Sequence, residues 1–531
     1  MEFKFRGSEI NQKTVLGHPS GLFVLFFTEM WERFSYYGMR ALLVLFLTTA
    51  LIGDNSGWGW ERSDATLMYG WYIGLVYLTP IIGGWIADKF LGFRKSVILG
   101  ALIMTLGHAS MALEIAADLF FYLGLVLMIL GNGLFKPNIS SMVGQLYKTQ
   151  GKEKDAGYTI FYMGINSGAF LGILLCGYIG EKVGWHYGFG LAGVFMFVGM
   201  LQFKYAQKIF GNIGLDPRQT EDFDDVLEDS IEQVSEDIED VVEDVKKSKV
   251  NRDRIVVISI FALFTTFFWW AFEQAGGSMT IFAVDYTDRA LEGTAANTFK
   301  VINAIITVVP MLVITWVLSM LFKQTFSKYA LSNVILGIGF AIIWAIVLWM
   351  LAREFKADTT EVPASWFGVL NSLFIIIFAP IFSKIWQSRY NPSGPVKFAV
   401  GLILVGLGFA ILSYGATAIP DGAQTASVSL IFLVLAYLFH TLGELCVSPV
   451  GLSYVSKLAP LKLVGMMFGI WFIANFLAGV IGGWTASYID PISEEYGLST
   501  FFLIFTLIPV GAGIVMLLIS PMIKRMMHGI K

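Results

Sequence analysis

Long apolar segments recur along the whole chain, and they restrict its fold more than any other feature. Each has roughly 20 to 30 mostly apolar residues, enough to cross a hydrocarbon layer of about 30 Å as a helix that rises about 1.5 Å per residue. Strands of a membrane barrel would be far shorter. Since 56% of the 531 residues are hydrophobic and only 14% are charged, the apolar surplus exceeds what one water-soluble core can bury. The sequence predicts an all-α polytopic membrane protein.

Apolar runs separated by charged breaks predict fourteen membrane-spanning helices. The spans cover residues 20–52, 65–87, 95–117, 119–147, 156–181, 187–210, 254–285, 298–322, 330–352, 364–388, 396–418, 427–456, 463–488 and 498–523. The first 18 residues are polar and mixed in charge, unlike a secretory signal, so we expect the N-terminus to be cytoplasmic. Lys and Arg are then concentrated in the inner loops, as the positive-inside rule requires. An even number of spans also makes the C-terminus cytoplasmic.

Two pairs of similar stretches indicate a parallel internal repeat. PIIGGWIADKFLGFRK from Pro80 parallels PIFSKIWQSRYNPSGPVK from Pro380, and GNGLFKPNISS parallels GELCVSPVGLS. Halves related in this way place a substrate site between them, near the middle of the membrane. The two spans at 298–352 are surplus to two six-helix bundles. They leave and return to the same side, so they invert nothing that follows.

The predicted organisation has five parts. They are an N-terminal six-helix bundle at 1–210, an acidic cytoplasmic linker at 211–253, the first helix of the C-terminal bundle at 254–289, an extra helix pair at 290–360 and the remaining C-terminal helices at 361–531. A narrow apolar stripe lies on an otherwise acidic helix in the linker. It is formed by Leu227, Ile231, Val234, Ile238, Val241 and Val245. We expect a solvated connector, and a regulatory contact with the basic inner loops is the alternative.

The segment FFTEMWERFSYYGMR, residues 26–40, carries charge where a membrane span should be apolar. On a helix of about 3.6 residues per turn, its polar side chains share one side. They are Glu29, Glu32, Arg33, Tyr36, Tyr37 and Arg40. Each charged side chain would cost about 2.5–3.5 kcal/mol if it faced lipid, so we expect the stripe to face the bundle interior or a wet cavity. A static ion pair between Glu and Arg one turn apart is the alternative interpretation.

Further polar side chains lie inside other predicted spans. They are Lys136, Asn166, Glu273, Gln274, Asn371, His440 and Glu444. Each alone could be a satisfied buried group, but together they provide cations in the first half and an acid in the second. This suits a zwitterion with separated ends, its carboxylate bound by Arg40 and Lys136 and its ammonium group by Glu444. The two asparagines would bind a peptide unit between those ends. We expect His440, four residues before Glu444, to support that carboxylate.

Three motifs give the chain a resemblance to a known family. GGWIADKFLGFRK, residues 83–95, resembles the loop between the second and third helices of the major facilitator superfamily. EMWER, residues 29–33, resembles the acid-x-x-acid-Arg motif of its proton-dependent oligopeptide transporter (POT) family, and FYMGINSG, residues 161–168, resembles that family's fifth-helix signature. The chain is similar to the bacterial members over nearly its whole length. Those members usually insert their extra helix pair before the equivalent of the FWWAFEQ helix, whereas here the pair follows it.

The resemblance implies the major facilitator fold and proton-coupled import of di- and tripeptides by alternating access, in the plasma membrane of a bacterium. It implies a peptide site formed by Arg40, Tyr36, Tyr37, Tyr77, Lys136, Tyr162, Asn166, Trp269, Asn371, Glu444, Ser448 and Trp471. It also implies a proton-coupling and gating network of Glu29, Glu32, Arg33, Lys136 and Glu273. Tyr69 stands where animal members have a His, so we expect carboxylates to handle the proton. Peptides, protons and the lipid bilayer are the expected partners, with no cofactor, metal or nucleotide.

Other functions fit the sequence less well. An intramembrane metalloprotease would need His-Glu-x-x-His, which HTLGE at 440–444 lacks. No basic surface suggests nucleic acid. A peptide sensor that does not transport, and a carrier of nitrate or another anion, are alternatives on the same fold. Glu444 argues against the anion, because a bare anion avoids a carboxylate. We expect Cys176 and Cys446 to be buried thiols, since both lie in apolar spans.

Overall fold

The computed structural model describes residues 3–148, 151–215, 249–459 and 464–530. In this part of the chain fourteen helices have 19 or more residues. They are α1 (Ser20–Thr48), α2 (Arg62–Ile86), α3 (Gly92–Ala112), α4 (Asp118–Gln145), α5 (Lys152–Lys182), α6 (Trp185–Ala206), α8 (Lys249–Phe272), α10 (Gly293–Thr325), α11 (Ala330–Lys356), α12 (Val369–Gln387), α13 (Gly394–Ala416), α14 (Ile431–Leu458), α15 (Val464–Ala486) and α17 (Leu498–Met526). Each predicted span coincides with one of them, so the predicted all-α architecture is confirmed. The apolar stripe at 227–245 lies outside the described residues.

Short elements connect the long helices. Three strand pairs are β1–β2 (Thr14–Val15 with His18–Pro19), β3–β6 (Thr287–Asp288 with Val428–Ser429) and β4–β5 (Ala290–Leu291 with Thr360–Glu361). The short helical segments are η1 (Glu9–Gln12), η2 (Ala87–Leu91), η3 (Gln207–Phe210), η5 (Glu273–Gly276), α9 (Ser278–Ile281), η6 (Phe282–Tyr286), η7 (Ala364–Gly368) and α16 (Ile489–Tyr496). Segment η5 continues directly from α8, and η7 leads directly into α12.

Most of the long helices are suited to a membrane by length and composition. Twelve continuous helical segments of the described residues qualify, and one of them, Arg62–Ala112, contains both α2 and α3. Helix α1 is not among the twelve, and Glu29, Glu32 and Arg33 stand in the middle of its apolar run. All three side chains belong to residues that are at most 3% exposed. Protein therefore surrounds this part of the charged stripe, as the sequence predicts.

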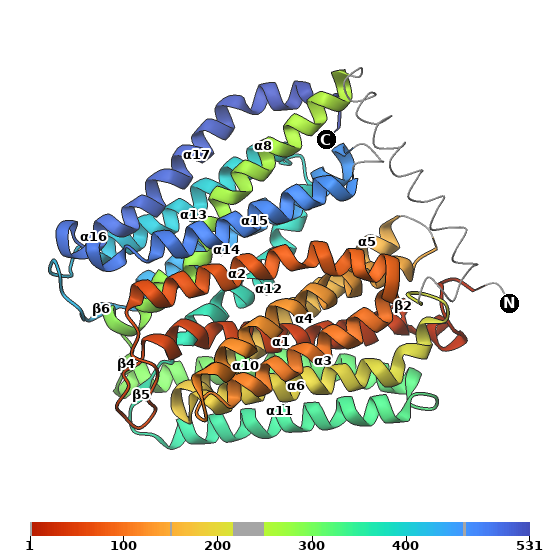
Figure 1. Cartoon of the computed structure of the whole chain (residues 1–531), viewed down its shortest axis with the longest axis horizontal. Helices are drawn as coiled ribbons and strands as arrows, with labels where there is room; N and C mark the ends of the chain where they lie inside the picture. The colour runs from red at the N-terminus through yellow and green to blue at the C-terminus, as the bar shows by residue number, and fades with distance from the viewer. Residues whose placement is uncertain (1–2, 149–150, 216–248, 460–463, 531) are drawn as a thin grey trace.

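The long helices form two groups, which meet at one end. The N-terminal group is α1–α6 and the C-terminal group is α8 with α12–α17. In Figure 1 the two groups diverge toward the side where both termini lie, which we call the inner end, and approach each other at the opposite, outer end. Helices α2 and α15 cross at glycines there, since a Cβ on Gly70 would overlap Gly483 and one on Gly74 would overlap Val480. The outer end is thus closed by direct helix–helix packing.

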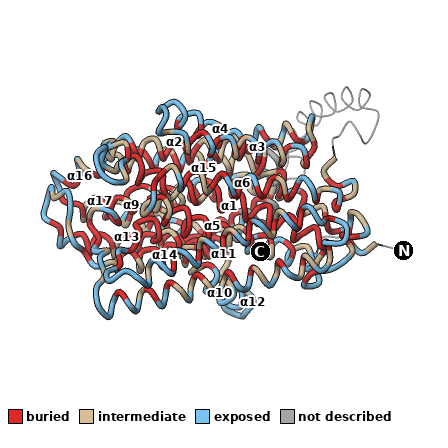
Figure 2. Tube along the Cα trace, turned by 90° about the horizontal axis from the view of Figure 1, so that it is seen from below, coloured by how far each residue is buried: buried red, intermediate tan, exposed pale blue. Residues whose placement is uncertain are grey.

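The extra pair, α10 and α11, follows α8 in the sequence, and α11 packs against the N-terminal group. Ser332 Oγ of α11 donates to the Gln202 carbonyl of α6 at 2.8 Å. Further along α11, the ring of Phe340 makes edge contacts with Phe27 and Trp31 of α1, at centroid distances of 5.6 and 5.5 Å. Figure 2 shows buried residues concentrated along the middle of the molecule, where α1 and α5 lie, and many exposed residues along α10 at its edge. Helix α11 therefore covers the face of α1 that carries Trp31.

Candidate functional site

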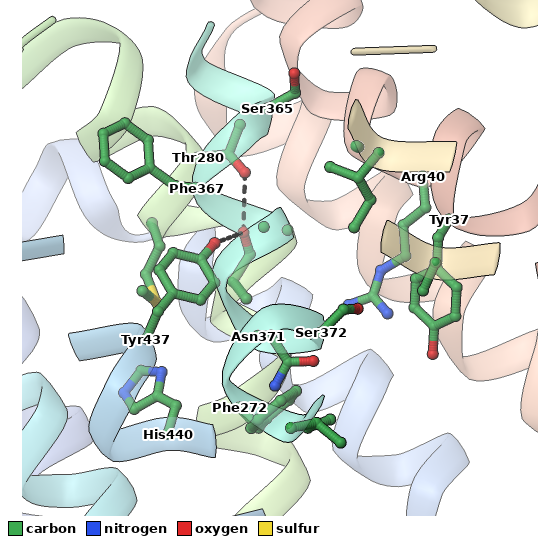
Figure 3. Close-up of a pocket in the computed structure, with 18 of the residues that line it drawn as sticks. Tyr37, Arg40, Phe272, Thr280, Ser365, Phe367, Asn371, Ser372, Tyr437 and His440 are labelled. Atoms are coloured by element: carbon green, nitrogen blue, oxygen red, sulfur yellow. Dashed lines mark hydrogen bonds between the residues drawn. The ribbon is translucent and has the colours of Figure 1, made fainter. Parts of the chain in front are cut away.

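A cavity of about 170 Å³ lies between the two groups of helices. Six of the predicted peptide-binding residues line it. His440 lines it as well, but among the described residues it forms no hydrogen bond with Glu444, so its expected support of that carboxylate is not observed. These six are Tyr37, Arg40, Tyr162, Asn166, Asn371 and Glu444. The apolar part of the lining includes Ile165, Ile173, Phe272, Met279, Phe367 and Ile375. Figure 3 shows Tyr37 and Arg40 on one side of the cavity and Asn371 and Tyr437 across it. A molecule inside would touch both groups at once.

On the C-terminal side, an amide holds the acid in place. Asn371 Nδ2 of α12 donates to Glu444 Oε2 of α14 at 2.8 Å and to Thr441 Oγ1 at 3.1 Å. Glu444 is only 9% exposed. Among the described residues no cation forms a salt bridge with it, so its charge rests on a neutral hydrogen-bond donor. A buried carboxylate without a cationic partner favours an incoming cation.

On the N-terminal side, Arg40 of α1 forms an ion pair with Glu273 of η5, which continues from α8 of the C-terminal group. Arg40 Nη2 donates to Glu273 Oε2, and Arg40 Nε donates to the hydroxyl of Tyr69 at 2.8 Å. The Tyr69 hydroxyl in turn donates to Glu273 Oε2 at 3.2 Å. A Cβ on Gly276 would overlap this hydroxyl, so the glycine makes the room that Tyr69 occupies. The three polar groups form a closed triangle that joins the two groups of helices.

Helix α8 is interrupted at this point, because it ends at Phe272 and the 3-10 segment η5 begins at Glu273. The carbonyl of Ala275 accepts hydrogen bonds from Thr280 Oγ1 at 3.0 Å and from the Tyr437 hydroxyl at 3.3 Å, the two dashed lines of Figure 3. Next to it, Gln274 Nε2 donates to the Gly482 carbonyl of α15 at 3.0 Å. Groups of α14 and α15 thus form hydrogen bonds with the backbone carbonyl of Ala275 and the side chain of Gln274 at the break.

A second charged cluster lies deeper in the N-terminal group. Arg33 Nε donates to Glu29 Oε1 at 2.8 Å and lies 2.6 Å from Glu32 Oε2. Asn132 Nδ2 of α4 donates to Glu32 Oε1 at 3.1 Å. One cation is therefore shared by two carboxylates. The Glu29–Arg33 contact is the pair expected one helical turn apart, and Glu32 adds an acid that a static pair does not need.

The other six predicted peptide-binding residues do not line the cavity. Lys136 Nζ lies 4.4 Å from the centroid of the Tyr77 ring, and the ring of Tyr36 stacks on Tyr72 at 6.3 Å. Trp269 packs edge-on against Phe272 at 5.0 Å, so it supports the wall from behind. The remaining two are Trp471, which is 6% exposed and packs where Gly451 has no side chain, and Ser448, whose hydroxyl has no hydrogen-bond partner among the described residues.

A further ion-pair cluster closes the outer end. Arg62, at the start of α2, lies 2.7 Å from Asp285 of η6 and 2.7 Å from Asp490 of α16. It also donates to the Gln424 carbonyl at 3.0 Å. The N-terminal group is thereby tied to three segments of the C-terminal group.

Sequence reasoning did not assign the residues that hold the charged groups in place. Tyr69, Thr441 and Tyr437 each position a site residue or the break in α8. Uncharged hydroxyls are common in membrane spans, so composition gives no signal for them. Arg62 lies three residues before the predicted span at 65–87, and this position does not indicate its partners.

Known proteins match the chain over nearly its whole length. A family model described as PTR2, POT family, matches residues 94–360 and 342–502. The uncharacterized transporter YclF of Bacillus subtilis is 36% identical over 532 residues, covering 98% of this chain and 97% of that protein. The peptide transporter YePEPT of Yersinia enterocolitica is 32% identical, covering 97% and 96%. A solved mutant of the peptide transporter POT in complex with alafosfalin has a TM-score of 0.74 at 30% identity, covering 98% of both chains. The chain belongs to the POT family.

Proposed function

We propose that the chain is a proton-coupled symporter that imports di- and tripeptides by alternating access. Family membership and relatives described as peptide transporters support this function. One observation carries the substrate assignment. The cavity has a cation, Arg40, on one wall and an acid, Glu444, on another, with amides and apolar side chains lining the space around them. A peptide with free ends has the complementary charges and an amide backbone between them.

In this proposal each end of the peptide meets one group of helices. Arg40 binds the carboxylate and Glu444 binds the ammonium group, while Asn166 and Asn371 bind the peptide unit. Asn371 uses Nδ2 to hold Glu444, which leaves Oδ1 to accept a peptide N–H. Carriage of nitrate or another anion is the rival, and a carboxylate such as Glu444 disfavours it. A peptide sensor would need the same contacts without the second charged cluster.

The partner that Arg40 has in this conformation supports proton coupling. It binds Glu273, so the peptide carboxylate competes with a buried acid for the same cation. A proton on Glu273 removes that competitor, and the cluster of Glu29, Glu32 and Arg33, with Lys136 nearby, offers a second place to exchange a proton. A proton moving down about 100 mV supplies about 2.3 kcal/mol, enough for roughly fifty-fold accumulation of a neutral peptide.

The protein acts as a transporter rather than an enzyme and needs neither cofactor nor nucleotide. It lies in the inner membrane of a bacterium with both termini in the cytoplasm. Residues 211–253 connect the two bundles there.

Uptake into liposomes tests the function. Purified protein with an imposed inward proton gradient should accumulate labelled dialanine, and Glu32→Gln should abolish accumulation. Glu354→Gln is the matched control, because Glu354 lies on α11 and binds the Tyr178 hydroxyl outside the cavity. Uptake that is independent of the gradient, or unaltered by Glu32→Gln, contradicts the coupling. Equal binding of dipeptides with free and with blocked amines removes Glu444 from its role.

A further inference from the structure

Glu181 is a carboxylate that the proposed transport cycle does not use, and it joins the two groups of helices. It lies at the outer end of α5, in the N-terminal group. Its Oε2 accepts a hydrogen bond from the backbone N–H of Ala364 at 2.8 Å, and its Oε1 accepts one from the N–H of Ser365 at 2.9 Å. The hydroxyl of Ser365 also donates to Oε1. One side chain thus makes three hydrogen bonds to the C-terminal group.

The two backbone donors are the first N–H groups of a long helix. Segment η7 runs on into α12 as one apolar helical segment, Ala364–Gln387. The first N–H groups of a helix have no partners within it and mark the positive end of its dipole. Pro363 precedes the helix and forms no side-chain cap. The cap is supplied instead by an anion from the other group of helices, and such charge-assisted hydrogen bonds are stronger than neutral ones.

The outer turns of α5 are shaped to receive η7. A Cβ on Gly177, one turn before Glu181, would overlap the Ser365 hydroxyl. Trp366 Nε1 donates to the Leu174 carbonyl at 2.9 Å. The Trp366 ring stacks on Tyr178 with centroids 5.8 Å apart and planes 29° from parallel. Two turns of α5 therefore contact η7 by hydrogen bonds and ring packing.

The same turn forms part of the wall of the candidate peptide site. Ala364, Ser365, Phe367 and Gly368 all line the cavity. Figure 3 shows Ser365 at the top of the view and Phe367 beside Thr280. Since Glu181 fixes the backbone of Ala364 and Ser365, it fixes the outer boundary of the cavity.

We infer that Glu181 is a positioning residue of the outer gate, and that its cap on η7 favours the conformation in which the cavity is closed to the outside. The inference rests on the proposed function, because alternating access requires the outer ends of α5 and α12 to separate. On separation Glu181 loses all three hydrogen bonds, and the start of η7 loses its cap. Contacts that exist in one conformation only shift the equilibrium toward it.

Distances between spin labels on the full-length protein in lipid, without substrate, test this role. The outer pair is Val183→Cys with Thr425→Cys, two exposed loop positions in different groups of helices. The inner pair is Ser141→Cys with Ser388→Cys, which are also exposed. Both native cysteines are buried, so the introduced ones take the label.

Glu181→Ala should raise the ratio of outer-open to outer-closed protein at least about tenfold, since a hydrogen bond to a charged group typically contributes about that factor or more. The outer distance then lengthens while the inner distance shortens. Glu181→Gln should have a smaller effect, because Gln keeps one acceptor oxygen. Gly177→Ala should act in the same direction as Glu181→Ala without changing the carboxylate. Asp118→Asn, an exposed carboxylate at the outer start of α4, should leave both distances unchanged.

Unchanged distances in both Glu181→Ala and Gly177→Ala would overturn the inference. Longer distances for both label pairs would also overturn it, because they indicate general unfolding rather than gating. The readout needs no substrate, so it is independent of the uptake assay. Failure of the wild-type protein to accumulate dialanine would contradict the proposed function and leave the measured effect of Glu181 in place.

Discussion

At the scale of single residues, Tyr69 gives the sharpest prediction, because its hydroxyl is bonded to both Arg40 and Glu273. Tyr69→Phe removes the hydroxyl and leaves both partners in place, each short of one hydrogen bond at a buried position. Such a loss costs about 1–3 kcal/mol, so we expect proton-driven dialanine uptake to fall at least fivefold. Tyr72→Phe on the same helix is the control. The Tyr72 hydroxyl is buried without a hydrogen-bond partner among the described residues, so uptake should stay at the wild-type level. Equal loss in both variants would contradict the role of Tyr69.

The site residues that could be predicted from the sequence are those with charged side chains inside an apolar span. Arg40, Glu273 and Glu444 are charged inside apolar spans, and this alone marks them as interior. Their partners were not predictable, because a pair such as Arg40–Glu273 depends on how α1 and η5 are placed in three dimensions. Lys136 was assigned to the peptide carboxylate from its charge, yet its side chain lies over Tyr77 outside the cavity lining in this conformation. Its binding role stays a prediction.

At the scale of helices, the extra pair should stabilise α1 through Phe340. This ring is 3% exposed and fills the space beside Phe27 and Trp31. Phe340→Ala leaves a void there, which costs about 3–5 kcal/mol in a water-soluble core. The cost is smaller in a membrane, where packing rather than transfer from water drives helix association. We expect a lower thermal unfolding midpoint in detergent. Leu348→Ala, on the lipid-facing side of α11 and 58% exposed, should leave the midpoint unchanged.

Hydropathy predicted every long helix but not how the helices are interrupted or grouped. At the break after Phe272, the Ala275 carbonyl accepts a hydrogen bond from Tyr437 of α14, which lies more than a hundred residues away in the sequence. The position of α11 against α6 was equally hidden. A face that packs on a protein helix and a face that meets lipid are both apolar, so the sequence of α11 does not distinguish them.

At the scale of the whole molecule, the internal repeat predicted a site between two halves, and the cavity lies there. The repeat could not predict which end of the molecule is closed. That depends on contacts between distant segments, such as Arg62 with Asp285 and Asp490. The same is true of Glu181 and η7. Each of these contacts joins residues that give no sign of their partner in the sequence.

The contacts at the outer end also include Glu361, an acid that should stay ionised as the pH changes near neutrality. Burial alone would raise the pKa of Glu361 in β5, but a hydrogen bond from Lys182 and the charges of Arg289 and Lys182 lower it below the ordinary value of 4.5. A lowered pKa means that the closed protein favours the ionised carboxylate. The ionised form therefore stabilises the closed protein above the ordinary pKa, and this stabilisation is lost only as the pH falls through the lowered pKa. Glu361 is therefore charged throughout the range of about pH 5 to 8.

We expect Glu361→Gln to leave the shape of the pH profile of dialanine uptake unchanged, even if it alters the rate at every pH. Glu32→Gln should flatten the same profile, because the proposed coupling network then lacks an acid that can exchange a proton. Initial rates at a fixed gradient, measured from about pH 5 to 8, compare the two variants with the wild type. A shifted midpoint in Glu361→Gln would place the pH-sensing group at the outer surface instead of in the membrane, and would contradict this division of roles.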